Sequence, residues 1–164
     1  MIIKTKRLFL RLLTERELQL WTTDLSALER ILSCTYQAEP LDGELADIIK
    51  LQAEKVANGA DPMFNSFWMI IREEDAVAIG SMAFKGSPNN NGEVEIGYGL
   101  GEAHRGLGYA TEAVQGLCNW ALQQGIASNV IAETEPGNDK SERVLERCGF
   151  TKYKDDINAW WSLL

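Results

Sequence analysis

The sequence is poor in the residues from which metal centres and covalent catalytic sites are most often built. Its 164 residues include one histidine, His104, and three cysteines, Cys34, Cys118 and Cys148. The cysteines are odd in number and lack C-x-x-C spacing, so we expect buried, reduced thiols rather than a disulfide framework or a zinc site. One histidine offers no Ser-His or Cys-His pair, and we expect it at the surface or behind a site rather than as a base. These shortages predict the absence of a metal centre and of a covalent nucleophile.

Positive charge and long apolar runs are also scarce. Lys and Arg number 16 against 24 Asp and Glu, which gives a formal charge of −8. Nucleic-acid binding generally requires a basic surface, so no nucleic-acid partner is expected, whereas an acidic surface favours cationic partners such as amines. No apolar run approaches the ~18 residues that span a bilayer, and the N-terminal segment is not typical of a secretory signal. We therefore predict a cytoplasmic protein that does not bind membranes.

Strand and helix patterns alternate along the chain without a linker or a repeat. Apolar residues make up 45% of the sequence and are spread throughout, which favours one domain over residues 1–164. Strands are predicted at 6–13, 66–71, 77–84, 93–100, 129–133, around Tyr153 and at 160–163. Helices are predicted from Thr14, with a capping box completed by Glu17, and over 24–34, 42–57, 109–124 and 138–148. This order predicts a mixed α/β (α+β) sheet with helices on its faces.

Residues 105–113 carry the most specific chemical pattern. Gly106 and Gly108 remove the side chains from a turn, and the apolar spacing of a helix begins directly after them. Such a turn leaves backbone N–H groups unpaired at the positive end of the helix dipole, which makes a site for an anion such as phosphate. Arg105 adds a guanidinium that faces either this anion or the solvent. The pattern therefore predicts a cofactor that carries phosphate.

Two common phosphate-binding motifs do not fit this loop. A Walker loop requires G-x-x-x-x-G-K-[ST], but Leu107-Gly108 stand where Lys and Ser or Thr are needed. A dinucleotide loop requires G-x-G-x-x-G/A, but Thr111 occupies the third glycine position, and the acidic ribose ligand about 20 residues later is missing from a strand end. The motif that does fit is R/Q-x-x-G-x-G/A, present as Arg105-x-x-Gly108-x-Ala110.

With this motif the chain resembles the GNAT superfamily of N-acetyltransferases, whose pyrophosphate loop for acetyl-coenzyme A (acetyl-CoA) has the same form. Three further segments resemble its RimJ/RimL-type branch, which acetylates the N-termini of ribosomal proteins. They are Arg7-Leu8-x-Leu10-Arg11, Glu95-Ile96-Gly97-Tyr98 and Asn138-x-x-Ser141-x-x-Val144-Leu145-Glu146-x-x-Gly149-Phe150. Together with the loop they extend over about residues 5–153, so the resemblance covers nearly the whole chain.

The resemblance implies a fold and a binding mode. The fold is expected to be a mixed, mostly antiparallel central sheet of six to seven strands, with helices on both faces and one splayed strand pair. In this family the strand at 95–98 pairs with the pantetheine arm through its backbone, and an N–H there polarises the thioester carbonyl. The residues that the resemblance assigns to acetyl-CoA are Ile96, Gly97, Tyr98, Arg105, Gly106, Leu107, Gly108, Tyr109, Ala110, Asn138 and Ser141.

Three residues are candidates for the chemistry. Alkylamines are largely protonated at pH 7, so a carboxylate base is useful, and Glu95 lies beside the expected acetyl position with Glu93 in reserve on the same strand face. The alternative is that Glu95 is a solvated carboxylate and the amine loses its proton to solvent. Asn138 is expected to cap its helix and, by resemblance, to reach the acyl region. Ser141 is either the donor to the departing thiolate or a first-turn serine without chemistry.

The function implied is transfer of an acetyl group from acetyl-CoA to a primary amine, by direct attack in a ternary complex. The acceptor would be a protein N-terminus or a small-molecule amine, and a homodimer is possible. The alternative function is a non-catalytic acetyl-CoA-binding module that serves as a sensor or a complex partner. An intact phosphate loop is compatible with both, whereas Glu95, Asn138 and Ser141 favour the enzyme.

Overall fold

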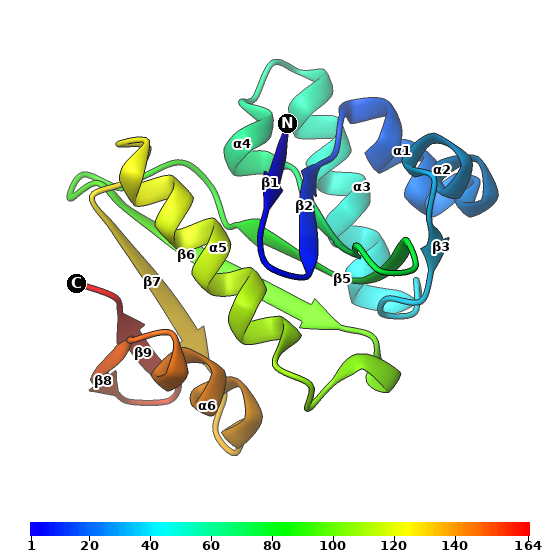
Figure 1. The fold of residues 1–164 in the computed structure, drawn as a ribbon. Coiled ribbons are helices and arrows are strands. Elements are labelled where there is room, and N and C mark those ends of the chain that lie inside the picture. The colour runs from blue at the N-terminus through cyan, green and yellow to red at the C-terminus, as the bar shows by residue number, and fades with distance from the viewer.

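A twisted sheet runs through the molecule and carries helices on both faces (Figure 1). The computed structural model describes all residues from Met1 to Leu164. The strands are β1 (Ile2–Lys4), β2 (Leu8–Leu12), β3 (Thr35–Tyr36), β4 (Trp68–Arg72), β5 (Val77–Phe84), β6 (Glu93–Leu100), β7 (Asn129–Thr134), β8 (Thr151–Asp155) and β9 (Ala159–Ser162). The helices are α1 (Glu15–Thr23), α2 (Leu25–Leu32), α3 (Gly43–Ala57), α4 (Pro62–Asn65), α5 (Tyr109–Gln123) and α6 (Asp139–Arg147).

The strand order is β1-β2-β4-β5-β6-β7-β9-β8, with β3 beside β5. All pairs on the main path are antiparallel except β6 with β7, and β3 also runs parallel to β5. The expected mixed, mostly antiparallel sheet with helices on both faces is confirmed. The expected six to seven strands are too few, because nine are present. The sequence missed β1 and β3, whose three and two residues are too short to show an alternating pattern.

The parallel pair β6–β7 separates soon after it begins. Its register runs from Glu93 opposite Asn129 to Glu95 opposite Ile131 and stops there. Beyond this point β6 remains paired with β5, from Ile96 to Leu100, while β7 pairs with β9. The two strands therefore form an opening in the sheet that faces their carboxyl ends, and the expected splayed pair is present.

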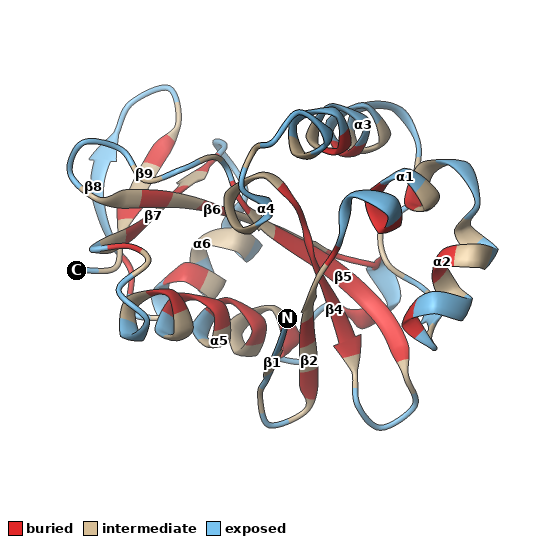
Figure 2. Ribbon diagram, turned by 90° about the horizontal axis from the view of Figure 1, so that it is seen from above, coloured by how far each residue is buried: buried red, intermediate tan, exposed pale blue.

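Two apolar clusters hold the helices on the sheet (Figure 2). On one face, the buried stripe of α5 packs against side chains from both halves of the sheet, including Leu10 of β2, Ile96 of β6 and Val130 of β7. On the other face, α1, α2 and α3 cover β4 and β5 through residues such as Trp21 and Met69. The opening between β6 and β7 thus lies in a sheet that is supported from both sides.

Local sequence signals account for where the helices start and stop. Thr14 and Glu17 form the predicted capping box: the Glu17 N–H donates to Thr14 Oγ1, and the Thr14 N–H donates to Glu17 Oε2 at 2.8 Å. Asn138 caps α6, and Gly149 follows its last turn with a φ of +93°, as its Gly-Phe ending predicts. None of the helices combines the length and the apolar character needed to cross a membrane.

Candidate functional site

The opening in the sheet presents backbone polar groups. The Lys85 N–H donates to the Glu95 carbonyl at 2.8 Å, and the Gly101 N–H donates to the Ile79 carbonyl at 2.8 Å. Because backbone groups in a strand alternate in direction, those of Tyr98 point away from β5 and toward β7. At this position β7 has already left the ladder. The N–H and C=O of Tyr98 are therefore available to an extended ligand that lies between the strands.

The glycine loop lies at the same end of β6. Gly106 and Gly108 have φ values of +76° and +82°, which L side chains rarely adopt. No backbone N–H from residue 106 to residue 111 finds a protein acceptor, and Gly108 supplies no side-chain cap to α5. A Cβ at Gly106 would meet nothing within 4 Å. The loop thus offers an accessible row of donors at a positive helix end, which fits a phosphate group.

Arg105 is an exposed residue whose guanidinium also bonds to the chain. Its Nε and Nη2 donate to the Leu100 carbonyl at 3.2 and 3.1 Å, so its guanidinium is turned back to the last residue of β6. In this position it fixes the loop to the strand. Leu107, at the tip of the loop, has 54% of its surface exposed.

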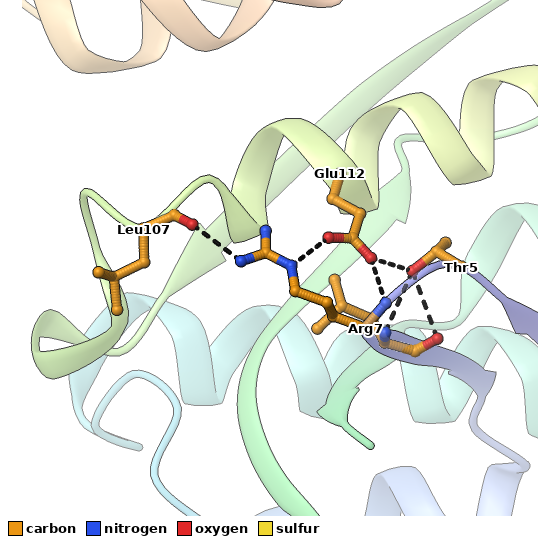
Figure 3. A network of polar contacts seen from close by, with 5 residues as sticks. Thr5, Arg7, Leu107 and Glu112 are labelled. Atoms are coloured by element: carbon orange, nitrogen blue, oxygen red, sulfur yellow. Dashed lines mark hydrogen bonds and ion pairs between the residues drawn. The ribbon is translucent and has the colours of Figure 1, made fainter. Parts of the chain in front are cut away.

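A carboxylate on α5 ties the loop to the first strands (Figure 3). Glu112 accepts hydrogen bonds from Thr5 Oγ1 at 2.7 Å, from the Arg7 N–H at 2.6 Å and from Arg7 Nε at 2.7 Å. Arg7 Nη1 donates in addition to the Leu107 carbonyl at 3.1 Å. Burial acts to raise the pKa of Glu112, but the bonds from Thr5 and Arg7 outweigh it and hold the pKa below its ordinary value. The ion pair between Arg7 and Glu112 thus connects the glycine loop and the first turn of α5 to the segment between β1 and β2.

Tyr109, the first residue of α5, is enclosed by two cations. The guanidinium carbon of Arg7 lies 4.3 Å from its ring centroid, and that of Arg72 lies 5.8 Å away. Arg72 also forms two bonds to Asp75 and contacts His104. The ring at the start of α5 thus lies near two guanidinium groups, each of which is also paired with a carboxylate.

Of the two positions expected for His104, the surface is excluded, because only 5% of the residue is exposed, and the residue lies behind the loop. It belongs to a 3₁₀ turn (Glu102–His104) before the loop, with Nδ1 3.3 Å from Arg72 Nη1 and Nε2 3.0 Å from Gln37 Oε1. A guanidinium can only donate, so Nδ1 accepts and the protonated Nε2 donates to Gln37. The ring is therefore neutral and structural.

This arrangement predicts how stability changes with pH. Burial and the Arg72 charge lower the pKa of His104 below 6.5, so the unfolded chain takes up a proton that the folded chain excludes. We expect the free energy of unfolding to fall as the pH is lowered through about 6.5, and the contribution of His104 to level off below its folded-state pKa. Urea unfolding of the wild type and H104Q between pH 5.5 and 8 tests this. Equal pH slopes for the two proteins would contradict it.

Glu95 lies on the sheet face opposite to that of α5. Its carboxylate forms an ion pair with Lys85 at 2.8 Å, and its side chain is about one fifth exposed. A Cβ at the next residue of this face, Gly97, would be 3.0 Å from Lys85 Cε, so the lysine passes over that glycine. Glu93, on the same face, accepts from Asn89 Nδ2 at 3.0 Å. The structure places Glu95 beside the point where β6 and β7 separate, in contact with a cation that the sequence did not indicate.

Ser141 and Asn138 lie on the other side of β6. Asn138 Oδ1 accepts from the Ser141 N–H at 3.3 Å, which is the predicted capping bond. Tyr98 Oη lies 2.8 Å from Ser141 Oγ. Since side chains alternate along a strand, Tyr98 and Glu95 project from opposite faces. The candidate acid and the candidate base therefore flank the opening from its two sides.

Several contacts of the site were not found from the sequence. Arg7 was noted only as part of a first-strand segment, and Glu112 was not singled out, although an acidic residue in the first turn of a helix is a recognisable favourable placement. The contact between the Tyr98 side chain and Ser141 was not predicted either. No group of three or more His, Cys, Asp or Glu side chains is arranged to hold a metal ion.

Comparison with known proteins identifies the family. A family model described as "Acetyltransferase (GNAT) domain" matches residues 7–151. The match includes β6, the glycine loop, α5 and α6. The chain belongs to the GNAT acetyltransferase family.

Relatives and solved structures agree with this assignment. The chain is 38% identical over 95 residues to "Uncharacterized N-acetyltransferase YjdG" of Bacillus subtilis, an alignment that covers 58% of this chain and 56% of that protein. It is 31% identical over 87 residues to "Ribosomal-protein-serine acetyltransferase" of Escherichia coli, covering 53% and 48%. The chain thus spans about half the length of the curated relatives it matches. A structure of RimL, a ribosomal L7/L12 alpha-N-protein acetyltransferase, in complex with coenzyme A superposes with a TM-score of 0.69 at 17% identity, covering 99% of this chain and 97% of that one. The same fold is therefore shared, including with the RimJ/RimL-type branch.

Proposed function

We propose that this protein is an N-acetyltransferase that transfers the acetyl group of acetyl-CoA to a primary amine. The observation that carries the proposal is the separation of β6 and β7 directly beside the unpaired N–H groups at the start of α5. An elongated molecule with an anionic end and a polar arm fits these two features together. Family membership and the named N-acetyltransferases among the relatives support the same reaction.

The roles of the chain's residues follow from their positions. The N–H groups of residues 106–110 would bind the pyrophosphate, assisted by the dipole of α5. Ile96, Gly97 and Tyr98 would contact the pantetheine arm, and the Tyr98 N–H, which faces away from β5, would stabilise negative charge on the thioester oxygen. Glu95 would take a proton from the attacking amine on one side of the sheet. Ser141 would donate to the departing sulfur on the other side. The amine would attack the thioester directly, without an acyl-enzyme.

The acceptor is proposed only by chemical class. A ribosomal-protein-serine acetyltransferase among the relatives favours a protein N-terminus, while a small amine is equally compatible with the base. Coenzyme A release should therefore be measured over a panel that includes N-terminal peptides and polyamines. Binding of acetyl-CoA without release for any acceptor would favour the second candidate function, a non-catalytic acetyl-CoA-binding module.

The role of Glu95 is tested by E95Q. The substitution keeps the shape of the side chain and removes its ability to accept a proton, so we expect kcat/KM to fall by about 100-fold at neutral pH. The loss should shrink at pH values above the pKa of the acceptor, where the amine is already neutral. E93Q is the matched comparison, since it changes the reserve carboxylate on the same strand face. A large loss in E93Q and none in E95Q would assign the base to Glu93.

A further inference from the structure

The side chain of Tyr98 makes a contact that the proposed mechanism has not used. We propose that Tyr98 is a positioning residue for Ser141, in which the phenol hydrogen bond aims the serine proton at the sulfur that leaves. The inference rests on the proposed function, because it concerns the departure of coenzyme A. The proposed function uses only the backbone of Tyr98, and this inference gives its side chain a role as well.

The contact joins the two sides of the opening. Tyr98 projects from β6, and Ser141 lies in the first turn of α6, which follows β7. The Oη–Oγ distance is 2.8 Å, while the distance from Oη to the Ser141 carbonyl is 3.3 Å. O–H···O bonds are most often about 2.7–2.8 Å long, so the hydroxyl is the better partner. The Ser141 carbonyl also belongs to the backbone ladder of α6.

The direction of the hydrogen bond decides what Ser141 can do. If the phenol donates to Ser141 Oγ, the serine keeps its own proton free for another acceptor. Burial raises the pKa of Tyr98 to about 12, and the bond to Ser141 offsets this only in part. The phenol therefore keeps its proton at neutral pH, and the proposal assigns this proton to Ser141 Oγ, the nearer of its two acceptors. The capping bond from Asn138 holds the backbone of the same serine in place.

The chemical step balances without a proton from Tyr98. The amine nitrogen forms a bond to the thioester carbon, and the C–S bond breaks with its electron pair on sulfur. The sulfur receives the proton of Ser141 Oγ, which is then replaced from solvent, while the nitrogen gives its surplus proton to Glu95 or to solvent. Tyr98 keeps its proton throughout. It acts only by fixing the orientation of the serine hydroxyl.

The experiment compares Y98F, S141A and the double variant. Y98F keeps the ring and removes one oxygen, so the packing on the sheet is preserved. We expect kcat to fall about fivefold, the usual effect of losing one hydrogen bond, with KM for acetyl-CoA unchanged. S141A should lose at least as much, and the double variant should equal S141A because Tyr98 acts only through Ser141. Y153F is the control for removal of a phenol hydroxyl elsewhere, since Tyr153 is 56% exposed.

A second acyl donor separates positioning from general structural damage. Acetyl-seleno-coenzyme A is a selenoester whose leaving group is a selenolate, and because a selenol is more acidic than a thiol, the selenolate leaves without needing a proton. The Y98F deficit should disappear with this donor and persist with acetyl-CoA, whereas structural damage would affect both equally.

Each outcome has a distinct meaning. Wild-type kcat in Y98F, additive losses in the double variant, or an equal deficit with both donors would overturn the role of Tyr98 and leave the acetyltransferase function standing. A loss in Y153F without one in Y98F would do the same. If the wild type binds acetyl-CoA but releases no coenzyme A with any acceptor, the proposed function fails and the inference fails with it.

Discussion

Replacement of Gly108 by glutamate is expected to abolish coenzyme A binding. Gly108 has a φ of +82° and stands directly before the unpaired N–H groups of α5, and a Cβ there would lie 3.4 Å from Arg7 Nη2, so glutamate would strain the turn and place a negative charge beside the loop proposed for the pyrophosphate. Two unit charges about 4 Å apart repel by roughly 4 kcal/mol near a protein surface. At 1.4 kcal/mol for each tenfold change, the dissociation constant should rise by at least about 100-fold. Isothermal titration of G108E and wild type with coenzyme A measures this directly.

G125E is the matched control for G108E. Gly125 also has a left-handed backbone conformation, with a φ of +66°. It lies at the opposite end of the same helix, and a Cβ added there would meet nothing within 4 Å. The control therefore introduces the same charge and a similar backbone strain, without an effect on the loop. Unaltered coenzyme A affinity in G108E, or an equal loss in G125E, would refute the assignment of the loop.

E112Q is expected to loosen the loop and to destabilise the fold. The carboxylate accepts three hydrogen bonds from Thr5 and Arg7, and an amide cannot accept through its NH₂ group, so at least one charge-assisted bond is lost. We expect a loss of about 2 kcal/mol, which corresponds to about 4–8 °C in Tm for a chain of this size. Coenzyme A affinity should fall with it, because Arg7 also holds the Leu107 carbonyl.

The pH dependence of E112Q gives an independent check. The pKa of Glu112 is lowered on folding, so its stabilisation is present above the unfolded-state pKa and is lost as the pH falls through the folded-state pKa. The difference between wild type and E112Q should therefore be largest near neutral pH and shrink in acid. E54Q is the control, since Glu54 is exposed on α3 and makes no ion pair, and it should change stability by less than about 0.5 kcal/mol. An E112Q protein as stable as E54Q would contradict the network.

The features that were predicted correctly are determined by residues close together in the sequence. The capping box at Thr14, the cap at Asn138 and the glycine turn before α5 each depend on residues within a few positions of one another. The separation of β6 from β7 followed from resemblance to a family, since nothing in either strand taken alone indicates where pairing ends. The sheet was therefore predictable in type, while its two shortest strands were not.

The contacts that the sequence did not reveal join distant segments. Glu112 and Arg7 are 105 positions apart, Arg72 and His104 are 32 apart, and Tyr98 and Ser141 are 43 apart. A burial pattern can place each of these residues on a face of an element, but it does not say which partner that face meets. For this reason the sequence left His104 either at the surface or behind a site, and it did not indicate Arg72 and Gln37 as the partners of its ring.

The short seam between β6 and β7 has a mechanical consequence. The two parts of the sheet, β1 to β6 and β7 to β9, are joined along three residue pairs only, from Glu93 to Glu95. Beyond these pairs no backbone ladder fixes the angle between the two parts. The buried face of α5 packs against both parts of the sheet, because its Ala113 and Leu117 belong to the cluster that contains side chains of β2 and of β7. The angle between the two parts of the sheet thus depends on the thickness of this helix. A change of side-chain volume at Ala113 or Leu117 would therefore alter the opening without replacing a residue of the site.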